Sequence, residues 1–444
     1  QWRRRNLTPL GRITVVKSLA ISKIVHLFIS LPTPPKDIIH KLNKLFFEFV
    51  WKSSVVRVKK KVVTQEYIDG GLKMVEIENF DASMKISWVK KMLKITDPPK
   101  WLKILGETID IDKIIKLGPN YVLQQTKTTT NQFWKDVFKS WKKLCACFGN
   151  HNATTDICKS ILWYNENIQI DKKTIFLKSW YDNNIFLVNT LINKDGGFLS
   201  YNQFTNIYGG VKTNFLEFFS VIQAVKKYFR QSGQVHLIRE DEPLIPFHIL
   251  PLVLDNTGNK KSYKILNYSG EIPTGQKKWN EYFLFTEQEW EKINVNVFKT
   301  TNDKKLQWLQ YRINQRILTT NTFLKKIKIS NSDKCTFCLR EKETIEHVLY
   351  ECEKVQRFLS TVATWFFEFF TFNIVTEKKA FILGCSESEF IKTINYHLKY
   401  YIYSSRCKDS NKVSKYMEGG ILYWTRNLAF RIKCIEQFEN YKWK

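Results

Sequence analysis

Apolar side chains recur every three or four positions through most of this chain, a spacing that predicts amphipathic helices. In the first hundred residues, Thr8-Pro9 suits an N-cap followed by a first helical residue, and Pro35 can open a second helix. Gly70-Gly71 indicates a turn, and a further helix is expected over 80–94 with Trp88 and Met92 facing inward. The second helix has one predicted apolar stripe: Ile38, Ile39, Leu42, Leu45, Phe46 and Phe49.

Other segments fix the predicted fold class. The basic run VVRVKKKVV, residues 55–63, alternates as a strand or hairpin arm would. Residues 231–280 are expected to be loop-rich or extended. Helices are predicted over 131–145, 200–208, 214–229, 304–318, 343–370, 387–405 and 416–438. We therefore predict a mainly α protein with few short strands.

Breaks in this pattern suggest three consecutive domains. The stretch TDPPKW, residues 96–101, is a plausible boundary because its two prolines end a helix. We expect a helical domain over 1–100, a linker and helical region over 101–300, and a Cys/His-containing domain over 301–444. No internal repeat or low-complexity tract interrupts them.

Charge sets the expected partner. Lys and Arg number 70 against 42 Asp and Glu, which gives a net charge of +28 over 444 residues. A field of that sign attracts polyanions, so nucleic acid is the default partner. The alternative is a solvated basic surface without a specific role. A hydrophobic content of 43% argues for a folded chain in either case.

Two basic clusters are the candidate nucleic-acid contacts. The first hundred residues hold 20 basic and 8 acidic residues, and binding to phosphates there would be salt-dependent. Trp308, Tyr311 and Phe323 are interleaved with the second cluster, where aromatic rings could stack on unpaired bases or simply pack in the core. The candidates are Arg3, Arg4, Arg5, Arg12, Lys17, Lys23, Arg57, Lys59, Lys60 and Lys61, then Arg312, Arg316, Lys325, Lys326 and Lys328.

The strongest chemical motif is CTFCLREKETIEHVLYEC, with the spacing C-x2-C-x8-H-x4-C. Its ligands would be Cys335, Cys338, His347 and Cys352. Three thiolates and one imidazole complete a tetrahedral zinc set with no open position, which is typical of a structural site. We therefore expect structural zinc, without a metal-bound water.

A second Cys/His group has unusual spacing for zinc. Cys145, Cys147, His151 and Cys158 follow C-x-C-x3-H-x6-C, and Cys145 lies on the apolar stripe of a helix, so core cysteines are favoured. Nine cysteines in 444 residues do not make a disulfide framework, and zinc thiolates beside free cysteines suit a reducing compartment.

Catalytic motifs are absent from the sequence. It has no Asp-Asp pair, Gly-x-Ser-x-Gly, Gly-rich phosphate loop or His-Glu-x-x-His. Residues 358–375 have the length of a membrane span but include Glu368, so a buried helix is expected. The chain starts at Gln1 in a basic run with no apolar signal core, and we expect a fragment or processed piece of a longer protein.

Several blocks carry a family resemblance, in order along the chain. Residues 1–35 (QWRRRNLTPLGRITVVKSLAISKIVHLFISLPTPP), 42–51 (LNKLFFEFVW) and 69–93 (DGGLKMVEIENFDASMKISWVKKML) resemble the region after the polymerase palm in LINE-type (non-LTR) retrotransposon reverse transcriptases. Residues 306–356, from LQWLQYRINQRIL to HVLYECEKVQ, resemble their C-terminal zinc-knuckle segment. SYNQFTNIYGG, residues 200–210, resembles the linking region.

This resemblance implies a function for each part. The first blocks would form a helical thumb that grips the primer–template duplex through the helix of Arg3 to Lys23 and through Arg57 to Lys61. An extended helical C-terminal region with a CCHC zinc knuckle would bind element RNA and engage target DNA during target-primed reverse transcription. The expected partners are RNA and target DNA, with no membrane and no small-molecule substrate. The expected location is nuclear at the site of action and cytoplasmic as a ribonucleoprotein.

The palm, whose Asp-Asp pair binds the catalytic metals in that family, lies upstream of the resembling blocks. We therefore expect this fragment not to be an enzyme, although its parent polyprotein would be an RNA-directed DNA polymerase. Two alternatives stay open: an inactive, zinc-stabilised retroelement remnant that acts as a structural or protein-interaction module, and a cryptic nuclease or transferase.

Overall fold

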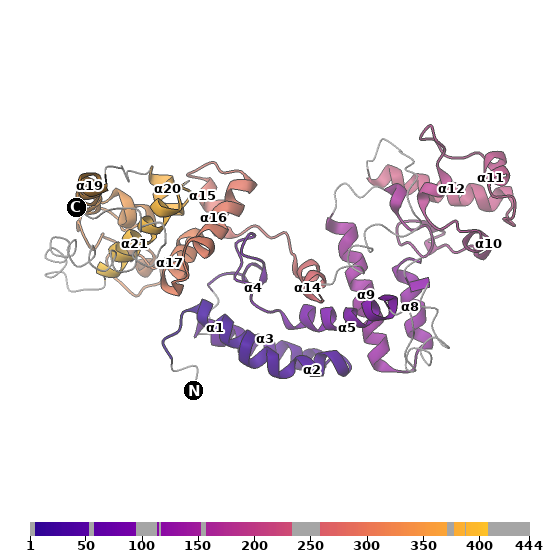
Figure 1. The fold of residues 1–444 in the computed structure, drawn as a ribbon, viewed down its shortest axis with the longest axis horizontal. Coiled ribbons are helices and arrows are strands. Elements are labelled where there is room, and N and C mark those ends of the chain that lie inside the picture. The colour runs from indigo at the N-terminus through magenta and orange to yellow at the C-terminus, as the bar shows by residue number, and fades with distance from the viewer. Residues whose placement is uncertain are drawn as a thin grey trace. The chain divides into compact units, whose positions relative to one another are not determined.

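The protein is mainly helical, as the sequence predicts. The computed structural model describes residues 5–52, 57–94, 113–114, 117–151, 157–232, 258–370, 377–386 and 388–406. Within those ranges the named strands are β1 (Gln169–Ile170) and β2 (Lys173–Thr174), which pair antiparallel around a tight turn. The rest of the regular structure is helix (Figure 1).

The chain divides into two compact units, each built from separated segments. The first unit comprises Gln1–Leu19, Lys44–Met74 and Ser269–Lys444, and the second comprises Ala20–Asn43 and Val75–Tyr268. This grouping differs from the three consecutive domains expected from sequence. Contacts such as the 2.9 Å bond from Gln315 Nε2 to the Gly70 carbonyl join distant segments of the first unit. The boundary expected near 96–101 lies outside the described residues.

The N-terminal helices begin where the sequence predicts. The α1 helix (Pro9–Val15) continues through the π-helix η2 (Val16–Ile21) into α2 (Ser22–Ser30), and α3 spans Lys36–Trp51. Thr8 caps α1 by accepting a 3.3 Å bond from the Gly11 N–H, and Pro9 stands first in the helix. The predicted cap is therefore confirmed.

The predicted apolar stripe of α3 is buried only in part. Its buried side chains are Ile39, Phe47 and Val50, whereas Ile38 and Leu45, both assigned to the stripe, are 44% and 59% exposed. Apolar residues occupy more than one face of α3, and periodicity does not say which face packs against the rest of the protein.

The basic run expected to be a strand forms a helix in its second half. Residues 53–56 lie outside the described residues, and α4 spans Lys60–Thr64. Val62 and Val63 are both buried, which strand alternation would not allow. The chain then turns at Gly70-Gly71 and returns to α4, where the N–H groups of Leu72 and Met74 both donate to the Val63 carbonyl. The predicted turn is confirmed.

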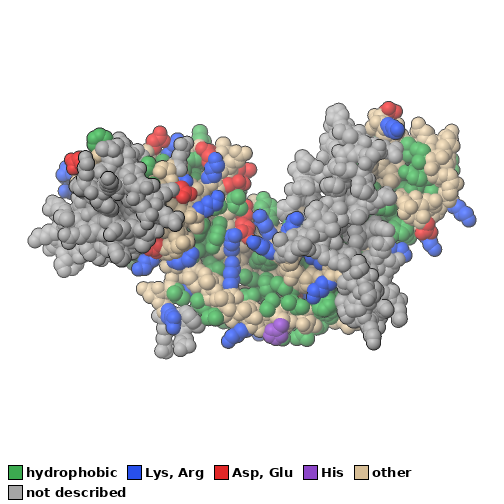
Figure 2. Space-filling model, in the orientation of Figure 1, with side chains coloured by type: hydrophobic (Ala, Val, Ile, Leu, Met, Phe, Trp, Pro, Cys, Tyr) green, Lys and Arg blue, Asp and Glu red, His purple; other side chains and the backbone are tan. Residues whose placement is uncertain are grey.

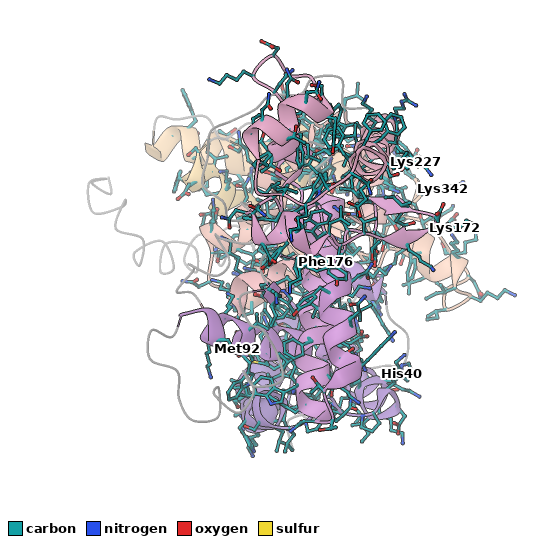
Figure 3. The ribbon with its side chains drawn as sticks, turned by 90° about the vertical axis from the view of Figure 1, so that its right-hand side faces the viewer. His40, Met92, Lys172, Phe176, Lys227 and Lys342 are labelled. Atoms are coloured by element: carbon teal, nitrogen blue, oxygen red, sulfur yellow. The ribbon has the colours of Figure 1, made fainter. Side chains whose placement is uncertain are left out.

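Part of the second unit is a helical layer formed by α5 (Ile77–Lys94), α8 (Pro119–Thr128), α9 (Gln132–His151) and α14 (Lys260–Asn267) (Figure 1). Its core includes Ile86, Val137, Phe138 and Trp141. Met92, marked in Figure 3, is buried there and Trp88 is partly buried, as predicted.

The remainder of the second unit packs around buried tryptophans. It contains η3 (Ile157–Lys159), the strand pair, α10 (Lys178–Asp182), η4 (Val188–Leu191), α11 (Tyr201–Ile207) and α12 (Phe215–Ser232). Trp163 and Trp180 are fully buried and contact edge to face, with ring centroids 5.8 Å apart. Ser200 and Gln203 form a capping box at the start of α11, which confirms the predicted helix.

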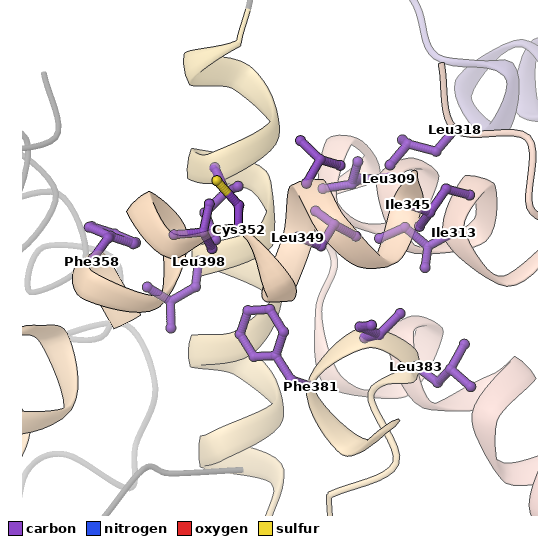
Figure 4. Packing of buried hydrophobic residues seen from close by; sticks show 14 of the residues in the cluster. Leu309, Ile313, Leu318, Ile345, Leu349, Cys352, Phe358, Phe381, Leu383 and Leu398 are labelled. Atoms are coloured by element: carbon purple, nitrogen blue, oxygen red, sulfur yellow. The ribbon is translucent and has the colours of Figure 1, made fainter. Parts of the chain in front are cut away.

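The first unit ends in a helical array that holds the Cys/His motif. Its helices are α15 (Thr274–Asn280), α16 (Glu287–Thr300), α17 (Lys304–Asn314), α18 (Asn321–Lys326), η5 (His347–Glu351), α19 (Glu353–Phe370), α20 (Lys378–Leu383) and α21 (Glu389–Ser405). One apolar core runs through them and includes Leu309, Ile313, Leu349, Phe381 and Leu398 (Figure 4). The helices α14 and α15 correct the loop expected over 231–280, and residues 233–257 and the helix expected over 416–438 lie outside the described residues.

Two segments resemble membrane spans in length or composition. In the described part of 358–375, Phe358, Val362 and Phe366 are buried in the core of the first unit, as expected for a core helix. Among the described residues, Pro9–Ser30 has the length and composition of a membrane span, with 22% of that window buried. Core helices and signal sequences share this length and composition, so no membrane role follows from them.

Candidate metal centre

The first two cysteines sit on a short hairpin. The chain pairs Lys334 with Lys342 in an antiparallel bridge, and the Cys335 N–H donates to the Glu341 carbonyl at 2.7 Å. Between them the Leu339 N–H donates to the Cys335 carbonyl at 2.9 Å, and Leu339 adopts a left-handed φ of 60°. This turn brings the Cys335 and Cys338 sulfurs to the same side of the hairpin.

The other two ligands come from a π-helical turn. In η5 the Cys352 N–H donates to the His347 carbonyl, five residues back, at 2.9 Å. In an α-helix, residues five apart would differ by about 140° around the axis. The wider turn closes that angle, so His347 and Cys352 face the same point. Such π turns are often found at functional sites.

The four ligand atoms converge at zinc spacing. All of them lie within 4.8 Å of one another. The Cys335 and Cys352 sulfurs are 3.9 Å apart, and the Cys338 sulfur lies 3.4 Å from His347 Nε2. Tetrahedral zinc, with bonds of about 2.3 Å to sulfur and about 2.0 Å to nitrogen, places such pairs roughly 3.8 and 3.6 Å apart. The predicted ligand set therefore fits zinc in both chemistry and distance.

Hydrogen bonds favour the thiolate form of Cys352. The Cys335 thiol donates to the Cys352 sulfur, which lowers the pKa of Cys352 to about 5 and raises the pKa of Cys335. The N–H groups of Lys354 and Val355, at the start of α19, also lower the pKa of Cys352. A 3.4 Å hydrogen bond from the Phe337 N–H to the Cys335 sulfur lowers the pKa of Cys335 and so opposes the rise. A divalent cation between the sulfurs would replace the shared proton.

The site is closed to solvent on most sides. Cys335 and Cys352 are 0% exposed and belong to the core of the first unit, and His347 is 8% exposed. Cys352 lies beside Leu349 and Leu398 in that core (Figure 4). Four protein ligands in such surroundings leave no position for a reactive water, so the arrangement is that of a structural site.

A buried carboxylate supports the hairpin, and sequence reasoning missed it. Glu343 is 0% exposed. Its carboxylate accepts bonds from the N–H and hydroxyl of Thr336, at 2.8 and 2.7 Å, and from the N–H of Asn321 at 2.8 Å. In the sequence, Glu343 stands among charged neighbours and looks like a solvated residue. Only its partners Thr336 and Asn321 reveal the role.

The second Cys/His group does not form one site within the described side chains. Cys145 and Cys147 pack against the core that includes Trp141, whereas Cys158 belongs to the separate core around Trp163. Burial raises the pKa of Cys145 to about 12, as expected of an inert core thiol. The side chain of His151 lies outside the described residues.

Arg12 is the main correction among the predicted phosphate contacts. Its side chain is 1% exposed, and its guanidinium donates to the carbonyls of Leu7 and Phe49 at 3.2 and 3.0 Å. It also lies over the Phe49 ring, 5.7 Å from the centroid. Arg12 therefore holds α1 against α3. Its place on the apolar side of α1 could have indicated this, because it is three residues from Val15 and four from Val16.

Arg316 is also engaged inside the protein. Its guanidinium bonds Glu346 at 2.6 Å and lies over the rings of Trp279 and Tyr282, at 4.2 and 4.9 Å. Arg316 therefore contributes to packing in this structure, and Arg312 is half-buried. Tyr311, 3% exposed, is likewise part of the protein interior, whereas Phe323 is 40% exposed.

The other predicted basic contacts are at the surface where they are described. Lys59 pairs with Glu271, Lys60 lies over the Phe47 ring, and Lys325 bonds Asp333 at 3.2 Å. Figure 2 shows lysine and arginine side chains interspersed with apolar ones on the face drawn. Arg3 and Arg4 lie outside the described residues. The exposed candidates are Arg5, Lys17, Lys23, Arg57, Lys59, Lys60, Lys61, Lys325, Lys326 and Lys328.

Comparison with known proteins bears on the same region. Residues 276–358 match the family described as zinc-binding in reverse transcriptase. The match covers the hairpin, the π turn and all four ligands. No curated protein matches the chain. The chain thus carries a reverse-transcriptase-associated zinc-binding segment, and the match supports a reverse-transcriptase-related protein.

Proposed function

We propose that this chain is the nucleic-acid-binding thumb and C-terminal part of a LINE-type, non-LTR retrotransposon reverse transcriptase. In this proposal it binds element RNA and target DNA during target-primed reverse transcription. It acts at nuclear DNA and travels in the cytoplasm as a ribonucleoprotein. The polymerase chemistry belongs to the parent polyprotein, and this chain contributes binding.

The observation that carries the proposal is the Cys335–Cys338–His347–Cys352 site inside a segment that matches reverse-transcriptase zinc-binding domains. A closed site stabilises a fold and positions its surroundings, and it offers no reactive metal position. The surroundings include the exposed Lys325, Lys326 and Lys328 on and after α18. The resemblance of residues 1–93 to the thumb region adds the N-terminal basic cluster.

The experiment is a salt series on the zinc-loaded chain. Binding to structured RNA and to nicked DNA is measured between about 50 and 200 mM salt. Contacts with 6–10 phosphates predict an affinity loss of about 10³–10⁵ over that range. A matched variant, with Lys325, Lys326 and Lys328 replaced by glutamine, should show a shallower slope. A flat slope, or no binding at low salt, would reject the proposal.

A second candidate, a protein-interaction module, is favoured by one surface of the second unit. Ile207 on α11 and Phe215, Leu216 and Phe219 on α12 are 48–73% exposed. Exposed apolar side chains of this size mark interaction sites when they are contiguous. Binding to a defined protein that survives nuclease treatment and is lost in Leu216→Asp would support this role.

A further inference from the structure

An aromatic and arginine cluster forms where three distant segments of the first unit meet. Trp51 ends α3, Trp308 and Arg312 lie on α17, and Tyr403 lies near the end of α21. The Trp51 and Trp308 rings are 6.0 Å apart, and Trp308 stacks on Tyr311 at 5.6 Å with an interplanar angle of 19°. Trp51, Trp308 and Tyr403 are half-buried, so each presents part of its side chain to solvent.

Cations converge on these rings. The Arg312 guanidinium lies 5.8 Å from the Trp308 centroid and 5.0 Å from the Tyr403 centroid. The Arg406 guanidinium lies 5.1 Å from the centroid of the same Tyr403 ring. Burial lowers the pKa of Arg312, its hydrogen bond with Tyr403 opposes that shift, and the charges of Arg57 and Arg406 lower the pKa further. Among the described residues no carboxylate forms an ion pair with Arg312, whereas Arg406 pairs with Glu343.

Three buried donors in the cluster have no partner among the described atoms. They are Trp51 Nε1, Tyr311 Oη and Arg312 Nε. Tyr311 is 3% exposed, and a buried donor without an acceptor is destabilising. All three groups can donate, and two of them cannot accept. An acceptor placed against the cluster would satisfy these donors.

We propose that Trp51, Arg57, Trp308, Arg312 and Tyr403 bind an unpaired nucleotide of single-stranded RNA or DNA. A base stacks on the exposed part of the indole rings, and phosphate oxygens accept from the arginines. A duplex cannot offer a free base face, because its bases are already stacked on one another. The inference rests on the proposed nucleic-acid-binding function and specifies the single-stranded ligand.

The test compares matched variants on matched ligands. Trp308→Leu removes the stacking ring, and the control Phe367→Leu removes an exposed aromatic ring on α19. Arg57→Gln removes an exposed cation at the cluster, and Arg230→Gln removes an exposed cation from α12. Anisotropy of labelled 12-nucleotide single strands, RNA and DNA, is measured beside duplexes of the same length. Zinc content and melting temperature check folding.

The expected result is selective. Trp308→Leu weakens single-strand binding roughly 10-fold, as stacking losses do, and duplex binding changes by less than about 2-fold. Arg57→Gln loses more single-strand affinity than Arg230→Gln. If Trp308→Leu does not fold, the comparison of these two variants tests the inference. Photo-crosslinking with 5-iodouracil should yield peptides that contain Trp308 or Tyr403.

Two results overturn the inference. One is an equal loss for single strands and duplexes in Trp308→Leu. The other is the same affinity for Arg57→Gln and Arg230→Gln, with crosslinks only outside the cluster. Either result leaves the proposed function intact as long as the wild-type chain binds with a steep salt slope. Absence of wild-type binding to every ligand rejects both.

Discussion

The guanidinium of Arg406 donates to the carboxylate of Glu343, 63 residues earlier, at 2.5 Å, and the two side chains are 8% and 0% exposed. Through Glu343, the end of α21 is joined to Thr336 in the hairpin of the zinc site. Arg406 also donates to the Thr319 carbonyl at 2.7 Å. The ion pair therefore links three segments around the metal centre.

Replacing Glu343 should destabilise the first unit strongly. Glu343→Ala leaves the Arg406 cation buried without its partner, and breaking a buried pair from one side costs about 3–5 kcal/mol. Urea unfolding, followed by a probe of the zinc segment, measures the change. The control is Glu353→Ala, which breaks an exposed pair with Arg340 at 3.8 Å and should cost under about 1 kcal/mol. Equal costs for both variants would show that the buried pair has no special weight.

Removing one thiolate should unfold the hairpin. Cys338→Ser should lower zinc affinity by more than about 100-fold, since even changes outside the ligand shell cost about 10–100-fold. Hydrogen exchange should then show loss of protection over residues 333–353. Cys385→Ser is the control, because Cys385 lies outside the four-ligand cluster. One zinc per chain and an unchanged melting profile in Cys338→Ser would mean that the ligands are misassigned.

Lys399 should make stability depend on alkaline pH. It is 0% exposed, donates to Gln310 Oε1 and to the Ile382 carbonyl at 2.5 and 3.1 Å, and burial lowers its pKa well below the ordinary 10.5. Between the folded and unfolded pKa values, the unfolded chain binds more protons. The free energy of unfolding therefore rises with pH in that window, by at most about 1.4 kcal/mol per pH unit, and levels off above about pH 10.5.

For Lys399, the quantity to measure is the difference in unfolding free energy between the wild type and a variant. Urea unfolding of the wild type and of Lys399→Met is followed from pH 7 to pH 10, and the wild type should gain stability relative to the variant as pH rises. Other titrating groups cancel because both chains carry them. A constant difference across the range would mean that Lys399 keeps an ordinary pKa in the folded protein.

Gly71 should not tolerate a side chain. A Cβ atom there would lie 2.1 Å from the Gln65 carbonyl oxygen and 2.7 Å from that of Val62, and backbone atoms cannot move aside cheaply. Gly71→Ala should therefore cost at least about 2 kcal/mol, in the range of overpacked sites. At Gly209 the nearest atom is 3.7 Å away, so Gly209→Ala should change stability by less than about 1 kcal/mol. Thermal unfolding of both variants provides the comparison.

Local patterns predicted the elements that depend on local physics. The cap at Thr8, the helix of α11 and the turn at Gly70-Gly71 were correct, because capping, helical period and glycine turns involve neighbours in the chain. The zinc ligands were also predictable. Their spacing reflects a hairpin and one helical turn, both shorter than twenty residues, and the donor chemistry is specific.

Patterns that depend on distant neighbours were misread. The face of α3 that packs is set by residues it meets in space, and the run 60–64 forms a helix because Val62 and Val63 are both buried. Arg12 looks like a phosphate contact until the Phe49 carbonyl is found beside its guanidinium at 3.0 Å. Net charge alone does not separate such internal cations from exposed ones.

By itself, the sequence determined that this protein is mainly helical, strongly basic and able to form a Cys3His zinc site. The tertiary structure decided that Glu343 holds the zinc hairpin, and that Trp51, Trp308 and Tyr403 form one aromatic cluster. The physical reason is separation along the chain. Glu343 and Arg406 are brought together only by the shared core of α17–α21, and no local periodicity records which distant side chains will meet when that core forms.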